Sequence, residues 1–311
     1  MGHRGYLPVR AVLVGTALAA VQPSVPCGAE TAGSRPATPA AEQLAADPQD
    51  GSIVDGVYSN PYFGLRYPLP SGWQKGLEGP APSPNGYYVL STPDAPDPEH
   101  PGGTVVISAQ DMFFDLNPMT DARATLNDLR KSATDGNGQE PGAATDVTLA
   151  GRSFARVEID SSILPRIVLA TDIRCHVVMF TFASPDRELL AKLAASVDGA
   201  TLPKEASATG IGSPGPDSSS PVCIKDYATS EHVLHRVEPN WVSFRFPKIA
   251  VRVVIGRDGR AKHVHVISAE PQQAKNIEDA LAQWEFKPYE VNGHPVEVET
   301  GLIFQFKREP G

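Results

Sequence analysis

The sequence predicts an α+β protein of two domains, the second of which is a small domain with one helix on a short antiparallel sheet. Its 311 residues suit about two domains of ordinary size. Two stretches without hydrophobic periodicity, residues 30–52 and residues 204–221, are rich in Pro together with Ala and Glu or Gly and Ser. Between and after them, runs with the two-residue period of strands accompany a few amphipathic helical runs.

Residues 1–29 are interpreted as a signal peptide region. Arg4 and Arg10 precede or enter the apolar run 11–21, and small residues follow it. This run is far shorter than the ~20 apolar residues that cross a bilayer. We therefore expect an exported protein, periplasmic or envelope-associated, with a retained short anchor as the alternative. Residues 30–52 are predicted to be a disordered linker.

The first domain is predicted over residues 53–203. It is expected to open with a bent strand pair at 58–73 and to end with a helix after Ser184-Pro185, which we expect to cap it. The apolar stripe of that helix would be Leu189, Leu193 and Val197. A further helix is expected at 121–132, where Ala122, Leu126 and Leu129 share a face, and further strands at 87–91, 104–110, 154–161, 166–171 and 176–183.

This domain resembles the PsbP/Mog1-like fold of exported bacterial proteins. The resemblance is carried by Tyr58-x-Asn60, Phe63-Gly64 and Pro70-x-Gly72-Trp73, and by the ending in which a strand leads into a helix. It implies an α/β/α sandwich, and no known site transfers with it. Residues 204–221 then form a Pro/Gly/Ser-rich linker, which we expect to leave the two domains semi-independent.

The second domain, residues 222–311, contains a predicted hairpin. Two strand-like runs, 249–256 and 261–268, flank a turn at Asp258-Gly259. Closing the hairpin there sets Val253 opposite Val264 and Val251 opposite Val266. Because this register places the valines on one face, the turn and the hydrophobic pattern agree.

A helix and a long strand complete the second domain. Pro271 suits the first turn of the helix, and Ala274, Ile277, Leu281 and Trp284 give it one apolar stripe. Trp284 and Phe286 are interpreted as core residues. Pro288 forbids further helix and Asn292-Gly293 reverses the chain. In the strand that follows, one face carries Val296, Val298, Thr300, Leu302, Phe304 and Phe306, and the other carries Glu297, Glu299, Gly301, Ile303, Gln305 and Lys307.

These features, in this order, resemble the TonB C-terminal domain. The resemblance covers roughly the last quarter of the chain and is carried by the run 253–259, Val266-Ile267-Ser268, Trp284-x-Phe286-Lys287-Pro288-Tyr289, Asn292-Gly293 and the closing strand. It implies a periplasmic domain that adds a strand from an outer-membrane receptor to its own sheet. A full TonB transducer also has a membrane-anchored first helix that engages a motor, and this sequence predicts no such helix.

The resemblance and the long closing strand together suggest a docking edge. Unpaired main-chain groups at a sheet edge can bind an extended peptide. We predict that residues 297–306 form this edge, with Glu297, Glu299, Gly301, Ile303 and Gln305 at the partner, together with Asn292, Gly293 and Tyr289. The expected partner is a segment of an envelope protein or an outer-membrane receptor. A homodimer through the same edge is the alternative.

The histidines suggest a third, enzymatic hypothesis. His263 and His265 share a strand face, and His232 and His235 lie three apart, so four imidazoles could bind zinc or copper. The predicted register places Arg252 opposite His265, however, and a fixed cation disfavours a second one. We therefore interpret this face as polar and solvated, and we expect neither a metal nor another cofactor.

Composition and motifs exclude other classes. The net charge of −9 and the absence of a basic stripe argue against nucleic-acid binding. Glu297 and Glu299 share a face as a catalytic pair might, but they alternate with valines as a solvated face does, and no catalytic motif accompanies them. We expect a non-enzymatic protein. Cys175 and Cys223 could bridge in an oxidising compartment, and unpaired thiols fit the sequence equally well.

Overall fold

The computed structural model describes residues 46–76, 78–96, 102–114, 121–133, 142–161, 163–203, 221–240 and 248–305. All the described residues belong to one compact unit. The predicted signal peptide region and most of the two predicted linkers lie outside the described residues. Within the described part of the chain, no helix is both long and apolar enough to span a membrane.

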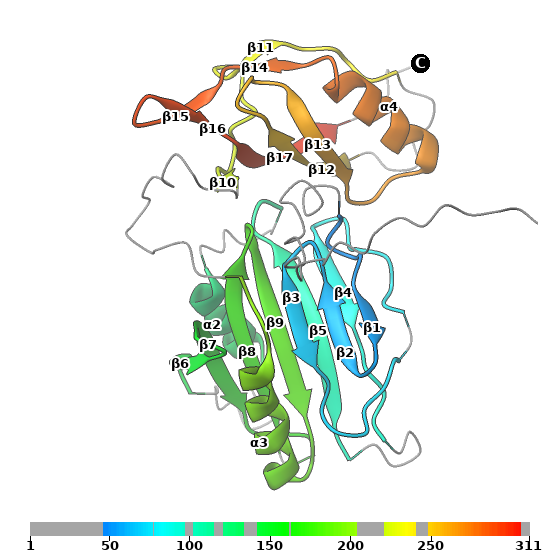
Figure 1. Cartoon of the computed structure of the whole chain (residues 1–311), viewed down its shortest axis with the longest axis vertical. Coiled ribbons are helices and arrows are strands. Elements are labelled where there is room, and N and C mark those ends of the chain that lie inside the picture. The colour runs from blue at the N-terminus through cyan, green and yellow to red at the C-terminus, as the bar shows by residue number, and fades with distance from the viewer. Residues whose placement is uncertain are drawn as a thin grey trace, which may run out of the picture. The chain divides into compact units, whose positions relative to one another are not determined.

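The first domain is built on a six-stranded antiparallel sheet (Figure 1). Its order is β4-β5-β9-β8-β7-β6. The strands are β4 (Tyr87–Ser91), β5 (Thr104–Asp111), β6 (Thr145–Leu149), β7 (Arg152–Ile159), β8 (Arg166–Ile173) and β9 (His176–Ala183). The hydrophobic runs in the sequence predicted every strand of this sheet except β6. The sequence signal missed β6 because it is an edge strand with no buried residue.

Helices cover opposite faces of this sheet (Figure 1). Leu126 of α2 (Ala122–Ser132) packs with Met179, whereas Leu193 of α3 (Arg187–Ala195) packs with Phe180. Neighbouring residues of β9 therefore face different helices, as side-chain alternation requires. A 3-10 helix, Ser196–Gly199, follows α3. The result is the predicted α/β/α layering.

A three-stranded sheet packs on the same side as α3. It consists of β1 (Ser52–Val54), β2 (Val57–Asn60) and β3 (Leu65–Pro68), all antiparallel. The ring of Tyr67 lies 5.4 Å from that of Phe180 in the large sheet. The predicted strand pair is confirmed as β2 and β3, and β1 precedes it.

The helix caps and stripes differ in detail from the prediction. Asp186, and not Ser184-Pro185, caps α3, because its side chain accepts hydrogen bonds from the amides of Glu188 and Leu189. The residues of α3 that are buried are Leu190, Leu193 and Ala194, while Leu189 is only partly covered. In α2, Leu129 is exposed and Thr125 is buried with Ala122 and Leu126.

The second domain has a sheet of order β10-β17-β12-β13, with α4 (Pro271–Leu281) on one face (Figure 1). Its strands are β10 (Val222–Cys223), β12 (Lys248–Ile255), β13 (Ala261–Val266) and β17 (Val298–Gln305). The hairpin register is the predicted one, with Val251 opposite Val266 and Val253 opposite Val264. Ile277, Leu281, Trp284 and Phe286 are buried against these valines, which confirms the predicted core.

Two short strand pairs flank the sheet. β15 (Tyr289–Val291) and β16 (His294–Val296) form a hairpin around Asn292-Gly293, and β11 (Val233–His235) pairs with β14 (Glu285–Phe286). The prediction of one continuous strand over 296–307 is wrong. Glu297 separates β16 from β17, because β16 pairs with β15 while β17 pairs with β12. Residues 306 and 307 lie outside the described part.

Candidate functional site

One side of β17 carries the candidate docking edge, and its first part is occupied. β12 pairs with the whole length of β17 on the other side. On the candidate side, β10 pairs in parallel with Val298 and Glu299. The amide of Val222 donates to the carbonyl of Glu297 (2.8 Å), and the amide of Ile224 donates to that of Glu299 (3.0 Å). Glu297 and Glu299 were predicted to meet a partner. Here the chain's own strand takes their outward main-chain groups.

Within the described part of the chain, the rest of this edge has no partner strand. Main-chain N–H and C=O groups alternate between the two sides of a strand. Because the carbonyls of Glu297 and Glu299 point toward β10, Gly301, Ile303 and Gln305 present their main-chain groups on that side. No strand among the described residues pairs with β17 there beyond Glu299. Ile303 is 55% exposed and Gln305 is also exposed. The candidate docking edge therefore comprises residues 301–305 and not the predicted 297–306.

A cavity of about 290 Å³ adjoins the open edge. Phe113 and Phe114 from the first domain line it on one side, and Trp284 and Arg236 contribute from the second domain. Main-chain and side-chain atoms of residues 301–304 complete the wall. A side chain of an added strand would meet the rings of Phe113, Phe114 and Trp284 together with polar groups, among them the charged side chains of Arg236 and Asp226.

The other predicted partner-binding residues lie away from the open edge. Tyr289, Asn292 and Gly293 belong to the β15–β16 hairpin, which is a separate two-stranded sheet. Asn292 and Gly293 are exposed at its tip, with φ values of 53° and 77°. Tyr289 is half-buried against Tyr227, with ring centroids 5.7 Å apart. The structure thus does not bring these three residues to the edge.

Gly301 allows the first domain to approach β17 closely. A Cβ atom at this position would lie 2.8 Å from Phe113 Cβ and 2.8 Å from Phe114 Cζ. We expect Gly301→Leu to lower the free energy of unfolding by about 1–3 kcal/mol, because the added atoms overpack this contact. Urea denaturation followed by fluorescence would measure the loss. Gly142→Ala is the control, since a Cβ there meets nothing within 4 Å. Equal stability of the two variants would contradict the contact.

The sheet face opposite α4 is buried and not solvated as predicted. Arg252 is 2% exposed, His265 is 5% exposed and Glu299 is 3% exposed. On the same face, Ala250 joins the hydrophobic core of the first domain. The two domains are therefore packed together and are not semi-independent. The polar residues of this face meet polar residues of the first domain, which is why they can be buried.

Arg252 is the centre of this interface. Its Nη1 lies 2.5 Å from Asp111 Oδ2 of β5, and its Nη2 lies 3.0 Å from Glu299 Oε1. The hydroxyl of Tyr62 donates to Glu299 Oε1 at 3.0 Å. Arg174 Nη2 lies 3.8 Å from the same oxygen. We call Asp111, Arg252, Glu299, Arg174 and Tyr62 the interface cluster.

Burial and charge act against each other on the two carboxylates of the cluster. Burial by itself would raise the pKa of Glu299, but Arg252 and Arg174 hold that pKa below its ordinary value. Burial raises the pKa of Asp111, and Arg252 only partly opposes the rise. The buried imidazole of His176 lies 3.7 Å from Asp111, and burial, followed by the charge of Arg252, lowers its pKa well below the ordinary value. The lowered pKa favours the neutral form of His176. Arg252 is the cation that forms an ion pair with Asp111.

We did not single out Asp111, Arg174 or Tyr62 from the sequence, although one signal pointed to the interface. The run 249–255 is apolar at every position except Arg252. A nearly continuous apolar run is typical of a strand that is buried on both faces. An arginine in such a run needs a buried anion, and β5 supplies it with Asp111.

The histidine pairs are engaged separately. His265 Nδ1 lies 2.8 Å and His263 Nε2 lies 3.4 Å from Asp47 Oδ1. Asp47 belongs to the stretch predicted as a disordered linker, so that prediction is wrong from residue 46 onward. His232 stacks on Tyr227, and His235 lies in β11. Among the described residues, no group of three or more His, Cys, Asp or Glu side chains could hold a metal ion.

The pKa shifts predict an acid-sensitive stability. The pKa of Glu299 is lowered, and so is that of Asp47, where hydrogen bonds from the histidines outweigh burial. Unfolding would return both to roughly 4. The unfolded chain then binds more protons, so the free energy of unfolding should fall as the pH drops below about 4. Asp111, with its raised pKa, contributes with the opposite sign.

Urea titrations between about pH 6 and pH 3 would measure this dependence. Glu299→Gln removes one of the lowered groups, so its stability should depend less steeply on pH than that of the wild type. A wild-type stability that is constant or rises toward acid would contradict the assignment.

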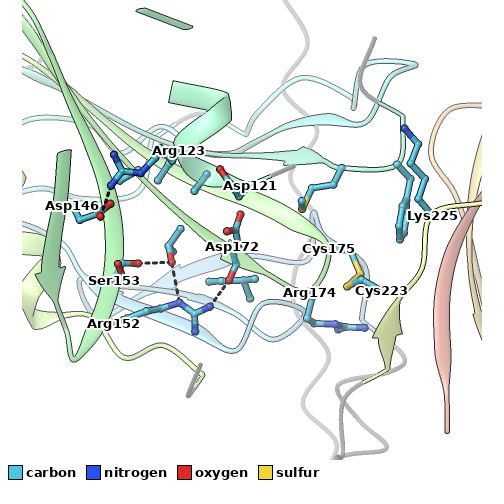
Figure 2. Close-up of a pocket in the computed structure, with 17 residues that line it drawn as sticks. Asp121, Arg123, Asp146, Arg152, Ser153, Asp172, Arg174, Cys175, Cys223 and Lys225 are labelled. Carbon is cyan, nitrogen blue, oxygen red and sulfur yellow. Dashed lines mark hydrogen bonds and ion pairs between the residues drawn. A yellow bond between two sulfur atoms is a disulfide. The ribbon is translucent and has the colours of Figure 1, made fainter. Parts of the chain in front are cut away.

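Cys175 and Cys223 form a disulfide between the two domains, with Cα atoms 5.7 Å apart. Cys175 lies in the turn between β8 and β9, and Cys223 ends β10. Figure 2 shows the disulfide beside a pocket of about 680 Å³. Two charged pairs lie in its wall: Arg123 pairs with Asp146, and Arg152 donates to the carbonyl of Asp172. The sequence had left the pairing of the cysteines open.

The second domain is similar to a known protein family. Residues 248–307 match the family described as Gram-negative bacterial TonB protein C-terminal. The matched region extends from the first strand of the β12–β13 hairpin through β17, and it contains the open edge. The predicted resemblance of the second domain is therefore confirmed, and we call it the TonB-like domain.

The search of solved structures found a likeness of fold. The solution structure of cyanobacterial PsbP (CyanoP) from Synechocystis sp. PCC 6803 is similar to part of the chain, with a TM-score of 0.33 and 15% identity. The similar region covers 47% of this chain and 91% of that chain. PsbP is one of the proteins that the first domain was predicted to resemble. A search of curated proteins returned no match.

Proposed function

We propose that this chain is an exported cell-envelope protein whose TonB-like domain binds an extended segment of a partner protein at residues 301–305. The partner is an envelope protein or the periplasmic segment of an outer-membrane receptor, and the role is in TonB-type transport across the outer membrane. The chain acts by binding and not by catalysis. Its family match over 248–307 supports the location in the Gram-negative envelope.

The observation that carries this proposal is the partial occupation of one edge of β17. The pairing of β10 supports strand addition at this edge, since Val222 and Ile224 donate main-chain hydrogen bonds to it. Beyond Glu299 the same edge presents the main-chain groups of Gly301, Ile303 and Gln305 without a described strand against them. Main-chain bonds to these groups would provide affinity. The cavity beside them, with both aromatic and charged side chains in its wall, would select the partner's side chains.

A proline at position 303 tests the edge directly. Ile303→Pro removes the outward amide, and proline is tolerated where the N–H of an edge strand faces away from its neighbour. The full-length chain would be measured against an array of peptides from periplasmic segments of outer-membrane receptors and other envelope proteins. For peptides that bind the wild type, we expect the Kd of the proline variant to rise about tenfold, the effect of one lost main-chain hydrogen bond.

Ile303→Ala is the matched control, because it shortens the side chain and keeps the amide. Its Kd should stay close to that of the wild type. Binding that is insensitive to the proline, or a folded chain that binds no peptide, would overturn the proposal. A dimer in sedimentation that the proline variant loses would instead favour the alternative, in which the edge pairs with a second copy.

A further inference from the structure

β10 is a short strand on the docking edge, and the disulfide ties it to the first domain. It has two residues; the amides of Val222 and Ile224 donate to the edge, and Ile224 packs on the core of the second domain. So short a strand is marginal without other support. The following residues are anchored elsewhere: Tyr227 is buried and its hydroxyl donates to the carbonyl of Lys287 at 2.5 Å. Release of residues 222–224 therefore does not require release of the whole segment.

We infer that the Cys175–Cys223 disulfide is a redox-controlled clasp that keeps β10 on the docking edge. Its reduction frees β10 and lengthens the open edge from 301–305 to 297–305. The consequence for partner binding rests on the function proposed above, whereas the release of β10 does not.

The exposure of the two cysteines determines which sulfur a reductant attacks. Cys223 is exposed and Cys175 is buried, so an external dithiol reaches the sulfur of Cys223. One thiolate of the dithiol attacks Cys223 Sγ, forms a mixed disulfide with it and expels the sulfur of Cys175, which takes up a proton. The second thiol of the reductant then attacks the mixed disulfide and releases Cys223 as a thiol. The dithiol becomes a disulfide, and two electrons pass to the cysteine pair.

The edge itself stays in place when β10 leaves. β17 pairs with β12 over its whole length. The side chain of Glu299 is held by Arg252 at 3.0 Å and by the hydroxyl of Tyr62 at 3.0 Å. None of these contacts involves β10. Reduction therefore exposes the carbonyls of Glu297 and Glu299 on a strand that is already ordered. A partner strand then gains these acceptors without a rearrangement of the sheet.

Hydrogen exchange measured by mass spectrometry tests the release of β10. The full-length chain carries Cys27→Ser, so that only the pair can react, and is measured oxidised and after reduction with dithiothreitol. We expect the amides of Val222 and Ile224 to exchange about tenfold faster, or more, after reduction, while the amides of β12 and the β17 amides that face β12 remain protected. Cys175→Ala with Cys223→Ala should match the reduced chain without any reductant. Unchanged exchange, or loss of protection across the whole domain, would overturn the clasp.

A peptide that copies β10 tests the lengthened edge. The probe is a synthetic peptide with the sequence of residues 220–225 in which serine replaces the cysteine. It should bind the reduced chain and the double alanine variant and fail to bind the oxidised chain. Faster exchange without binding of this probe would overturn the lengthening of the edge. Failure of the proposed function is separate, since it appears as loss of receptor-peptide binding at 301–305 in either redox state.

Discussion

Replacing Arg252 with methionine should lower the free energy of unfolding by about 3–5 kcal/mol. Methionine keeps much of the apolar volume of the side chain but removes its charge. The buried carboxylates of Asp111 and Glu299 would then lose the cation that lies 2.5 Å and 3.0 Å away. Because the cluster joins two domains, the variant should also unfold with less cooperativity between them. Urea denaturation followed by tryptophan fluorescence and circular dichroism would show both effects.

An exposed ion pair provides the control for this prediction. Lys262 lies 2.6 Å from Glu297, and its side chain is 50% exposed. Lys262→Met should cost less than about 1 kcal/mol, since solvent screens such a pair. Adding Asp111→Asn and Glu299→Gln to Arg252→Met should recover part of the loss, because the buried charges are removed together. A loss below about 1 kcal/mol for Arg252→Met by itself would contradict the central place of this residue in the interface.

Removing the disulfide should have an effect of similar size. Cys175 and Cys223 are 48 residues apart in the sequence. Closing a loop of that length restricts the unfolded chain by about 4 kcal/mol in the chain-entropy description. Cys175→Ala with Cys223→Ala should therefore unfold at a clearly lower urea concentration. Domains are commonly stable by about 5–15 kcal/mol, so the variant should still be folded without urea.

The reduced wild type is the natural comparison for this variant. Its urea midpoint should lie close to that of the double alanine variant when dithiothreitol is present. Cys27→Ser leaves the pair intact and should unfold with the wild type. A double variant as stable as the oxidised wild type would show that the bond does not restrict the unfolded chain.

Local patterns in the sequence predicted most of the strands and helices, and they also predicted the register of one strand pair. The β12–β13 hairpin has the predicted partners, Val251 with Val266 and Val253 with Val264. Its turn residues and its alternating valines act over a few positions, so neighbouring residues contain the information. The helix of the TonB-like domain and the turn at Asn292-Gly293 followed in the same way.

The candidate site was predicted only in part. Gly301, Ile303 and Gln305 remain at an open edge, whereas Glu297 and Glu299 meet β10 and Tyr289, Asn292 and Gly293 lie on another hairpin. The break at Glu297 was missed because alternation continues through it in the sequence. Nothing in that pattern shows that the strands on its two sides have different partners.

Periodicity and turn residues, which are local, were enough to predict most of the strands and helices and which residues share a face, although they missed β6 and the break at Glu297. Only the tertiary structure decided what covers each face and each edge. Glu299 alternates with apolar residues as a solvated residue does, yet Arg252 of the neighbouring strand and Tyr62, 237 residues away in the chain, contact its buried carboxylate. Contacts between such distant residues depend on how whole domains pack, and no short stretch of sequence contains that information.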